Sequence, residues 1–220
     1  MTDTLGIVGA GKLGLTLART AIAAGYEVMI SGSGRADRIA LQAEVLAPGA
    51  RTGTSADVAA FADIVVLALP MHRFRKLPRN LFAGKILIDA MNYWPETNGD
   101  DLELTGAAEG TSSVVQRRFP AAHVVKTLNQ LGYHEIEEYA RSDDSDRIAI
   151  GVAGDDPNSV RTAMQLIDRL GFDPVSAGPL ANGRALEPDG SPYATTYTSA
   201  ELVHRLATTR AAGRPASVVP

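Results

Sequence analysis

The chain has 220 residues, of which 45% are hydrophobic and 21% charged, with a formal net charge of -4 at pH 7 and no cysteine. These values predict a soluble globular protein with a substantial core, and they exclude disulfides, thiolate nucleophiles and cysteine-ligated metals. The acidic balance argues against non-specific nucleic-acid binding. The absence of a long apolar segment and of a signal-peptide pattern predicts a cytoplasmic protein without a membrane span.

Apolar strand patterns and helical patterns alternate along most of the chain. Strands are predicted at residues 5–8, 27–30, 50–52, 64–69, 85–89, 123–126, 148–152 and 172–175. Helices are predicted at residues 12–24, 38–46, 55–61, 113–118, 155–170 and 198–210, with Ser55 or Asp57 as the cap of the third. Residues 178–193 contain three prolines and three glycines, which predicts an extended or looped segment.

This alternation indicates an α/β fold, a single doubly wound Rossmann-type domain in which a largely parallel sheet has helices on both faces. We expect the domain, including the crevice for a second substrate, at residues 1–194, and a short C-terminal extension of helix and tail at residues 195–220. The crevice is expected at the carboxyl ends of the first and fourth strands.

A glycine-rich turn joins the first predicted strand to the first helix, and its residues are Gly9, Ala10, Gly11, Lys12, Leu13 and Gly14. In dinucleotide-binding crossovers the three glycines allow a tight turn, close approach of the pyrophosphate and close packing of helix on strand. The helix amino terminus also offers free N–H groups and a favourable dipole to an anion. A purely structural glycine turn is the alternative, but the flanking strand and helix favour cofactor binding.

The loop after the second strand lacks the acidic residue that usually binds the ribose hydroxyls of NAD. The chain instead has Ser31, Ser33 and Arg35 there, and Arg38 lies about one helical turn further on. Hydroxyls and a guanidinium bind a ribose 2′-phosphate, which a carboxylate would repel. The loop therefore predicts NADP(H) rather than NAD(H), although a polar surface loop would have the same composition.

Residues that follow the later strands are expected to lead toward the nicotinamide. Leu69 and Pro70 would line the cofactor, and His72 is either a proton donor or positioning group, or a solvated histidine at a helix start. Asn92 is placed in the same site, and Asn129 would bond the carboxamide or shape its turn.

Two further features near these strand ends have functional and purely structural interpretations. Trp94, the single tryptophan, would form a wall for a planar ring or pack against a neighbouring loop. The basic residues Arg73, Arg75, Lys76 and Arg79 would attract an anionic substrate or form a solvated helix face. The four histidines have no metal-ligand spacing, so we predict no metal site, and beyond His72 we identify no catalytic residue.

The chain resembles the NADP oxidoreductases that depend on the deazaflavin coenzyme F420. The matching stretches extend from residue 5 to residue 193 and are GIVGAGKLGLTLARTAIAAGYEV, ADIVVLALP, KILIDAMNYW, HVVKTLNQLG, VAGDD and GFDPVSAGPLANGRALEP. Two departures are a pair of glycines, Gly32 and Gly34, within the phosphate loop and the extension after residue 194. No separate substrate domain follows residue 175, so the second substrate is expected in the crevice beside the nicotinamide.

The resemblance implies an enzyme that transfers a hydride between NADP(H) and F420, with both rings stacked and shielded from water. It implies a small-molecule redox partner, no nucleic acid, no membrane and a homodimer, with which an apolar helix face near Leu202 and Leu206 is compatible. The basic residues would then contact the acidic tail of F420. The alternatives are an NADPH-dependent reductase of a flavin, metal chelate or small carbonyl, and a non-catalytic NADP(H) redox sensor.

Overall fold

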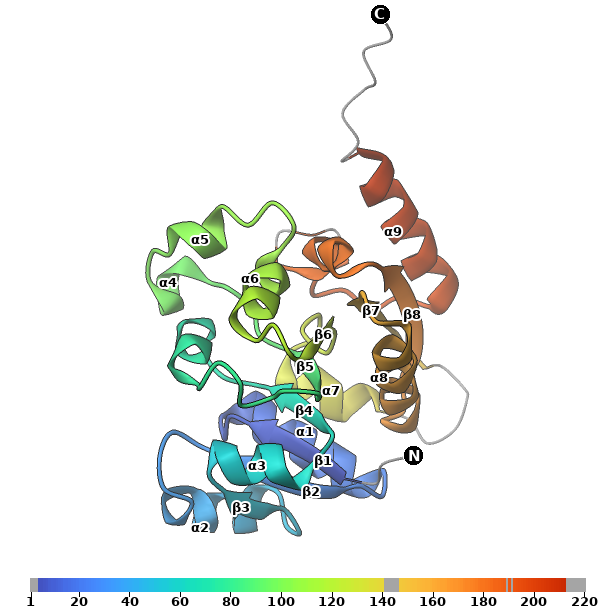
Figure 1. Cartoon of the computed structure of the whole chain (residues 1–220). Helices are drawn as coiled ribbons and strands as arrows, with labels where there is room; N and C mark the ends of the chain where they lie inside the picture. The colour runs from blue at the N-terminus through green and yellow to red at the C-terminus, as the bar shows by residue number, and fades with distance from the viewer. Residues whose placement is uncertain (1–3, 141–146, 189, 191, 213–220) are drawn as a thin grey trace, which may run out of the picture.

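A sheet of eight strands runs through the computed structural model, which describes residues 4–140, 147–188, 190 and 192–212 (Figure 1). The strand order is β3-β2-β1-β4-β5-β6-β7-β8. The strands are β1 (Thr4–Val8), β2 (Glu27–Ser31), β3 (Arg51–Gly53), β4 (Ile64–Leu67), β5 (Ile86–Asp89), β6 (His123–Lys126), β7 (Ala149–Gly154) and β8 (Asp173–Gly178). The predicted doubly wound α/β fold is therefore confirmed.

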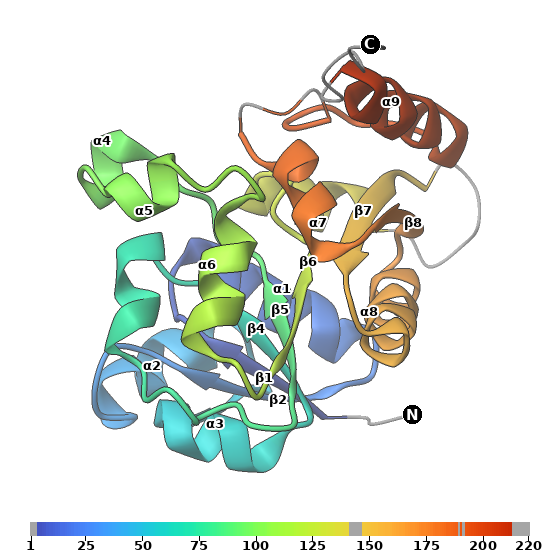
Figure 2. The ribbon, with the colours of Figure 1, turned by 45° about the horizontal axis from the view of Figure 1, so that its top comes forward.

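Helices cover both faces of this sheet (Figure 2). The α-helices are α1 (Lys12–Ala23), α2 (Asp37–Leu46), α3 (Ser55–Phe61), α4 (Pro95–Asn98), α5 (Leu102–Thr105), α6 (Thr111–Arg118), α7 (Tyr133–Tyr139), α8 (Pro157–Arg169) and α9 (Ser199–Ala212). Two 3₁₀ segments, η1 (Met71–Lys76) and η2 (Leu180–Leu186), complete the described elements. In the described residues, none of the helices is long and apolar enough to cross a membrane.

Strand alternation divides the core into two layers. On β4, Ile64 and Val66 belong to the cluster that contains residues of α1, α2, α7 and α8, whereas Val65 and Leu67 belong to the cluster that contains residues of α3, η1 and α6. Successive side chains of a strand point to opposite faces, so a continuously apolar strand is buried on both sides. This explains why the central strands were recognisable as uninterrupted apolar runs.

The sheet changes direction once, between β6 and β7. These two strands pair antiparallel, β7 and β8 pair parallel to each other, and the six other strands are mutually parallel. The amino end of β7 therefore lies at the same edge of the sheet as the carboxyl ends of β1 to β6. Because η2 follows β8 and packs on β6, β7 and α6, it reaches this functional edge.

The carboxyl-terminal helix α9 packs on β7 and β8, on the face opposite α8 (Figure 2). Leu202 and Leu206 are buried there with Leu186 of η2. The apolar face that the sequence offered for a dimer interface is thus covered by the protein's own sheet. The homodimer remains a prediction, but the buried face of Leu202 and Leu206 does not support it.

Several element bounds differ from those that the sequence predicted. The segment predicted as a loop at residues 178–193 contains η2, because Leu180 and Leu186 are buried despite the surrounding glycines and prolines. Helix α7 was missed, and β4 ends at Leu67 rather than at residue 69. Helix α3 is capped by Thr54, whose side chain accepts a hydrogen bond from the Asp57 backbone, rather than by Ser55 or Asp57.

Phe82 gives a test of the layer beneath α6. Its ring is fully buried and lies edge-on to Phe119, with 5.2 Å between ring centroids. We expect Phe82→Ala to lower the free energy of unfolding in urea by about 3–5 kcal/mol through lost burial and a residual cavity. Leu102→Ala is the control, because this leucine is 90% exposed and its loss should cost no more than about 0.5 kcal/mol. Equal costs for the two variants would contradict this packing.

Candidate functional site

A cavity of about 600 Å³ opens at the carboxyl ends of β1, β2 and β4. We call it the glycine-turn cleft, and its lining residues are Val8, Gly9, Ala10, Gly11, Gly32, Ser33, Gly34, Ile39, Gln42, Ser55, Ala68, Leu69, Pro70, Arg73, Lys76 and Leu77. The cavity lies where the sequence predicted a crevice, at the ends of the first and fourth strands. Leu69 and Pro70 line it as expected.

The glycines of the turn have different structural roles. A Cβ on Gly9, whose φ is +127°, would lie 2.1 Å from the carbonyl oxygen of Ala68. A Cβ on Gly14 would lie 1.8 Å from the carbonyl oxygen of Gly9, so α1 packs directly on the turn. A Cβ on Gly11 would meet nothing within 4 Å. The fold therefore requires Gly9 and Gly14, whereas the space at Gly11 is free for a ligand.

The amino terminus of α1 faces this space with its backbone. Gly11 is the N-cap, and no side chain hydrogen-bonds to the cap. Lys12 extends toward α7, where its Nζ lies 3.3 Å from the hydroxyl of Tyr133, and Leu13 packs against the core. Lys12 and Leu13 were predicted to bind the cofactor. They therefore offer an anion their backbone N–H groups, together with the helix dipole.

The structure does not gather the four residues that the sequence proposed for a 2′-phosphate. Ser31 is fully buried, with its Oγ 3.4 Å from that of Ser55, whereas Ser33 lines the cleft. Arg35 forms an ion pair with Asp37, with 2.7 Å between Nη2 and Oδ2, and its side chain is 81% exposed. Arg38 is exposed on α2. Neither arginine lines the cleft. Asp37, two residues after Arg35, was the feature of the sequence that could have indicated this ion pair.

Two other cations line the cleft, Arg73 and Lys76 of η1. They are three residues apart, and a 3₁₀ segment makes a turn about every three residues, so both lie on one side of η1. The sequence showed them only as members of a basic run. Arg75 of that run points elsewhere and bonds the carboxylates of Asp101 and Glu103. These bonds lower the pKa of Glu103 and tie η1 to α5.

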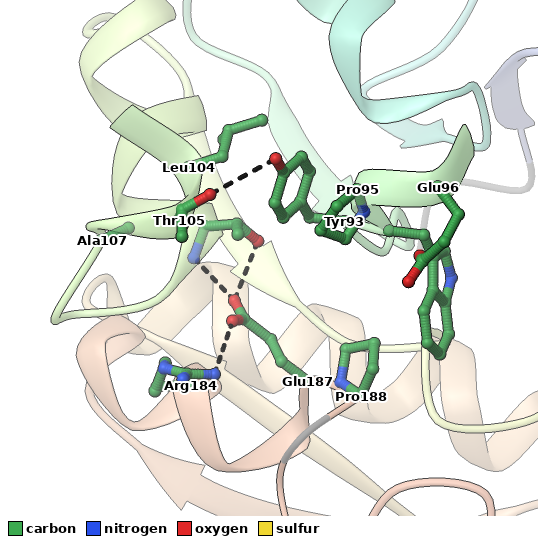
Figure 3. Close-up of a pocket in the computed structure, with 11 residues that line it drawn as sticks. Tyr93, Pro95, Glu96, Leu104, Thr105, Ala107, Arg184, Glu187 and Pro188 are labelled. Atoms are coloured by element: carbon green, nitrogen blue, oxygen red, sulfur yellow. Dashed lines mark hydrogen bonds and ion pairs between the residues drawn. The ribbon is translucent and has the colours of Figure 1, made fainter. Parts of the chain in front are cut away.

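A second cavity, of about 360 Å³, lies beyond β5 (Figure 3). We call it the aromatic pocket, and it is lined by Tyr93, Trp94, Pro95, Glu96, Leu104, Thr105, Ala107, Thr111, Arg184, Glu187 and Pro188. The Tyr93 hydroxyl accepts hydrogen bonds from the Asp101 backbone at 3.0 Å and from Thr105 at 3.3 Å. Trp94 is 40% exposed and lies edge-on to Tyr193. Trp94 thus both forms a wall and packs against a loop.

A buried carboxylate forms the polar side of the aromatic pocket. Glu187 accepts hydrogen bonds from the backbone of Thr111 at 2.6 Å and from its hydroxyl at 2.8 Å, and Arg184 pairs with it (Figure 3). Thr111 is the first residue of α6, where the helix dipole favours a negative charge. Glu187 is therefore held in place with its charge compensated, and it joins η2 to α6.

Asn92 and Asn129 meet at the carboxyl ends of β5 and β6. Asn129 Nδ2 donates to Asn92 Oδ1 at 3.0 Å and to the carbonyl oxygen of Leu186 at 2.7 Å. Asn129 Oδ1 is buried and has no hydrogen-bond partner among the described residues. The preceding residue, Leu128, has a φ of +62°, a strained conformation of the kind found at functional sites. This arrangement leaves one fixed, buried acceptor oxygen at the carboxyl end of β6.

A fully buried ion pair lies beneath the two asparagines. Lys126 Nζ is 3.5 Å from Asp89 Oδ2 and donates to the carbonyl oxygen of Met91 at 2.5 Å. Asp89 also accepts hydrogen bonds from Ser112 and from the Met91 backbone. The pair fixes the chain just before Asn92. This ion pair was not predictable from the sequence, because each residue ends a predicted strand and the pairing of the two strands was unknown.

His72 is held away from both cavities. Its Nδ1 lies 3.3 Å from Asn98 Oδ1, and its backbone N–H donates to the same oxygen. It lines neither the glycine-turn cleft nor the aromatic pocket. The structure thus brings Gly9 to Gly14, Ser33, Leu69 and Pro70 together, with Asn92 and Asn129 at a neighbouring point of the edge, and leaves His72 apart. No cluster of potential metal ligands occurs within the described residues.

Residues 4–93 match the family described as "NADP oxidoreductase coenzyme F420-dependent". This stretch contains β1 to β5, the whole glycine-turn cleft and the start of the aromatic pocket. The match confirms the resemblance that the sequence motifs indicated.

The similarity to other known proteins covers more of the chain than residues 4–93. A hypothetical protein of Sinorhizobium meliloti matches with a TM-score of 0.74 and 25% identity, covering 90% of this chain and 96% of that one. A candidate F420-dependent NADP reductase of Arthrobacter sp. FB24 matches with a TM-score of 0.64 and 27% identity, over 82% and 86% of the two chains. The metalloreductase STEAP3 of Rattus norvegicus is 24% identical over 185 residues. That match covers 83% of this chain and 35% of the relative, so the chain spans about a third of its length.

Gly11 separates a ligand-binding role from a structural one. We expect Gly11→Ala to change the free energy of unfolding by less than about 1 kcal/mol, because its Cβ enters open space at a helix cap. The same methyl group should raise the Kd for NADPH at least about tenfold, by obstructing the pyrophosphate. Gly9→Ala is the structural counterpart and should cost at least about 2 kcal/mol of stability. Unaltered NADPH affinity in Gly11→Ala would argue against this placement of the cofactor.

Proposed function

We propose that this chain, which belongs through residues 4–93 to the F420-dependent NADP oxidoreductases, transfers a hydride between NADP(H) and F420. NADP(H) would occupy the glycine-turn cleft, and F420 would occupy the aromatic pocket. The observation that carries the proposal is the placement of the two cavities. Both lie at the edge formed by the carboxyl ends of the central strands, and Asn92, which hydrogen-bonds Asn129, directly precedes Tyr93 and Trp94 of the aromatic pocket.

The cleft suits the adenosine and pyrophosphate part of a dinucleotide. The open space at Gly11 and the uncapped amino terminus of α1 would accept the pyrophosphate. Ile39, Leu69 and Leu77 supply apolar surface for the adenine. A dinucleotide on this fold extends across the crevice of the sheet, which would bring its nicotinamide toward the ends of β5 and β6.

In this proposal Asn129 would orient the nicotinamide. Both hydrogens of its Nδ2 are committed to Asn92 Oδ1 and the Leu186 carbonyl oxygen, so the side chain cannot turn over without setting oxygen against oxygen. Its free Oδ1 would accept a hydrogen bond from the carboxamide N–H group. The buried Lys126–Asp89 pair keeps this arrangement rigid through Met91.

The aromatic pocket suits a planar acceptor. Trp94 and Tyr93 offer ring surfaces, while Arg184 and the Thr111 hydroxyl supply polar groups at the far wall. The bound NADPH would supply a hydride from its nicotinamide C4 to C5 of the deazaflavin, leaving NADP⁺, and solvent would supply the proton that completes the reduction. The protein's own residues then need only to position two rings and exclude water. This is consistent with a site in which His72 takes no part.

The similarity to a metalloreductase favours a second acceptor class, a flavin or a metal chelate, over the same part of the chain. A single-turnover experiment separates the candidates. The protein is mixed with NADPH and oxidised F420, and the loss of the deazaflavin absorbance band is followed. Parallel reactions contain a flavin or a ferric chelate. We expect rapid loss of the F420 band, and faster turnover of another acceptor would contradict F420 as the substrate.

Trp94 tests the acceptor position. We expect Trp94→Ala to raise the KM for F420 by about tenfold, through the loss of a large aromatic wall, with an unchanged Kd for NADPH. Leu102→Ala, at an equally apolar but outward-facing residue, serves as the control and should alter neither constant. If Trp94→Ala weakens NADPH binding instead, the aromatic pocket belongs to the dinucleotide and not to the acceptor.

A further inference from the structure

The positive charges that line the glycine-turn cleft come from η1 and not from the loop after β2. Arg73 and Lys76 are the cationic residues in its lining, and both belong to η1, which follows β4. No carboxylate is found among the described residues that line the cleft. The cavity is therefore electropositive, and the loop after β2 contributes only Gly32, Ser33 and Gly34 to it.

Arg73 and Lys76 have side chains available for a ligand. Both are exposed, and within the described residues neither side chain forms a hydrogen bond or an ion pair. Arg75, between them in sequence, differs in both respects because Asp101 and Glu103 hold it. The segment η1 is thus fixed by Arg75 and by the buried Phe74, while its two other cations remain directed to the cleft.

Arg35 is poorly placed to supply the same charge. It makes two hydrogen bonds to Asp37, so the pair carries no net charge. An exposed ion pair is weak and a ligand can break it, but Asp37 would then stay close to the incoming phosphate and repel it. The contribution of Arg35 to binding a dianion is therefore largely cancelled by its own neighbour.

We propose that Arg73 and Lys76 form the 2′-phosphate subsite of the cleft and give this protein its preference for NADP(H) over NAD(H). The inference rests on the proposed function, since it requires a dinucleotide in the cleft. Ser33 and Ser55 supply hydroxyl donors to the same anion, and Arg73 offers two N–H groups in a fork that matches two phosphate oxygens. The determinant of cofactor choice thus lies after β4, and the loop after β2 contributes by lacking an acid.

This assignment also changes the role of the basic run. Arg73 and Lys76 line the glycine-turn cleft and are absent from the lining of the aromatic pocket. Arg75 is bound to acidic residues of its own chain. The expectation that the run contacts the acidic tail of F420 therefore has no support from the positions of these three side chains.

The test is a calorimetric titration of the full chain with NADPH and with NADH. We expect the double variant R73Q/K76Q to raise the Kd for NADPH at least about tenfold and to leave that for NADH within about twofold. The matched control is R35Q/R38Q, which removes the same charge from the loop after β2 and the start of α2. It should leave the Kd for NADPH within about twofold. Circular dichroism spectra should be unchanged, because all four side chains are exposed.

The outcomes separate the inference from the function on which it rests. If R35Q/R38Q abolishes the preference for NADPH and R73Q/K76Q keeps it, the inference is wrong and the proposed function stands. Equal weakening of NADPH and NADH by R73Q/K76Q also overturns the inference, because the cations would then act on a part common to both. A wild-type protein that binds neither nucleotide contradicts the proposed function itself.

Discussion

The direct contact of the glycine turn with the neighbouring strand sets the position of the whole site. Gly9 lies against the carbonyl group of Ala68, and Gly14 lies against the carbonyl group of Gly9, so α1, β1 and β4 meet without intervening side chains. Any Cβ at these points would separate the helix from the sheet. The same contact brings the uncapped amino terminus of α1 and the cations of η1 to the lining of one cleft. The cleft thus follows from close backbone packing, and the chain needs no added domain to form it.

The reversal of strand direction after β6 positions η2 beside the aromatic pocket. Because β7 and β8 run antiparallel to the others, the chain after β8 returns over the functional edge as η2. This places the Leu186 carbonyl group on Asn129 and the Glu187 carboxylate on the amino terminus of α6. Both contacts join segments more than 50 residues apart. Short helices and η2 therefore surround the aromatic pocket without a separate domain.

The sequence predicted the central fold well because its signals are local. The buried strands are continuous apolar runs, and GAGKLG stands at the one junction where such a turn is diagnostic. Prediction from the sequence failed where contacts between distant segments determine the local structure. Burial of Leu180 and Leu186 turned a glycine- and proline-rich segment into η2, and Asp37 neutralised the arginine that looked most suited to a phosphate. The cations that line the cleft were visible as a basic run, but only the 3₁₀ turn shows that positions 73 and 76 share one side while position 75 faces Asp101.

We propose that this cleft binds the adenosine end of a dinucleotide whose ribose carries an additional phosphate. The most direct measurement is a calorimetric titration of the unaltered protein with adenosine 2′,5′-bisphosphate and with adenosine 5′-phosphate, which isolates that end from the nicotinamide. We expect the bisphosphate to bind at least about tenfold more tightly, because the cleft is lined by two uncompensated cations and by no carboxylate among the described residues. Equal affinities, or tighter binding of the monophosphate, would contradict it.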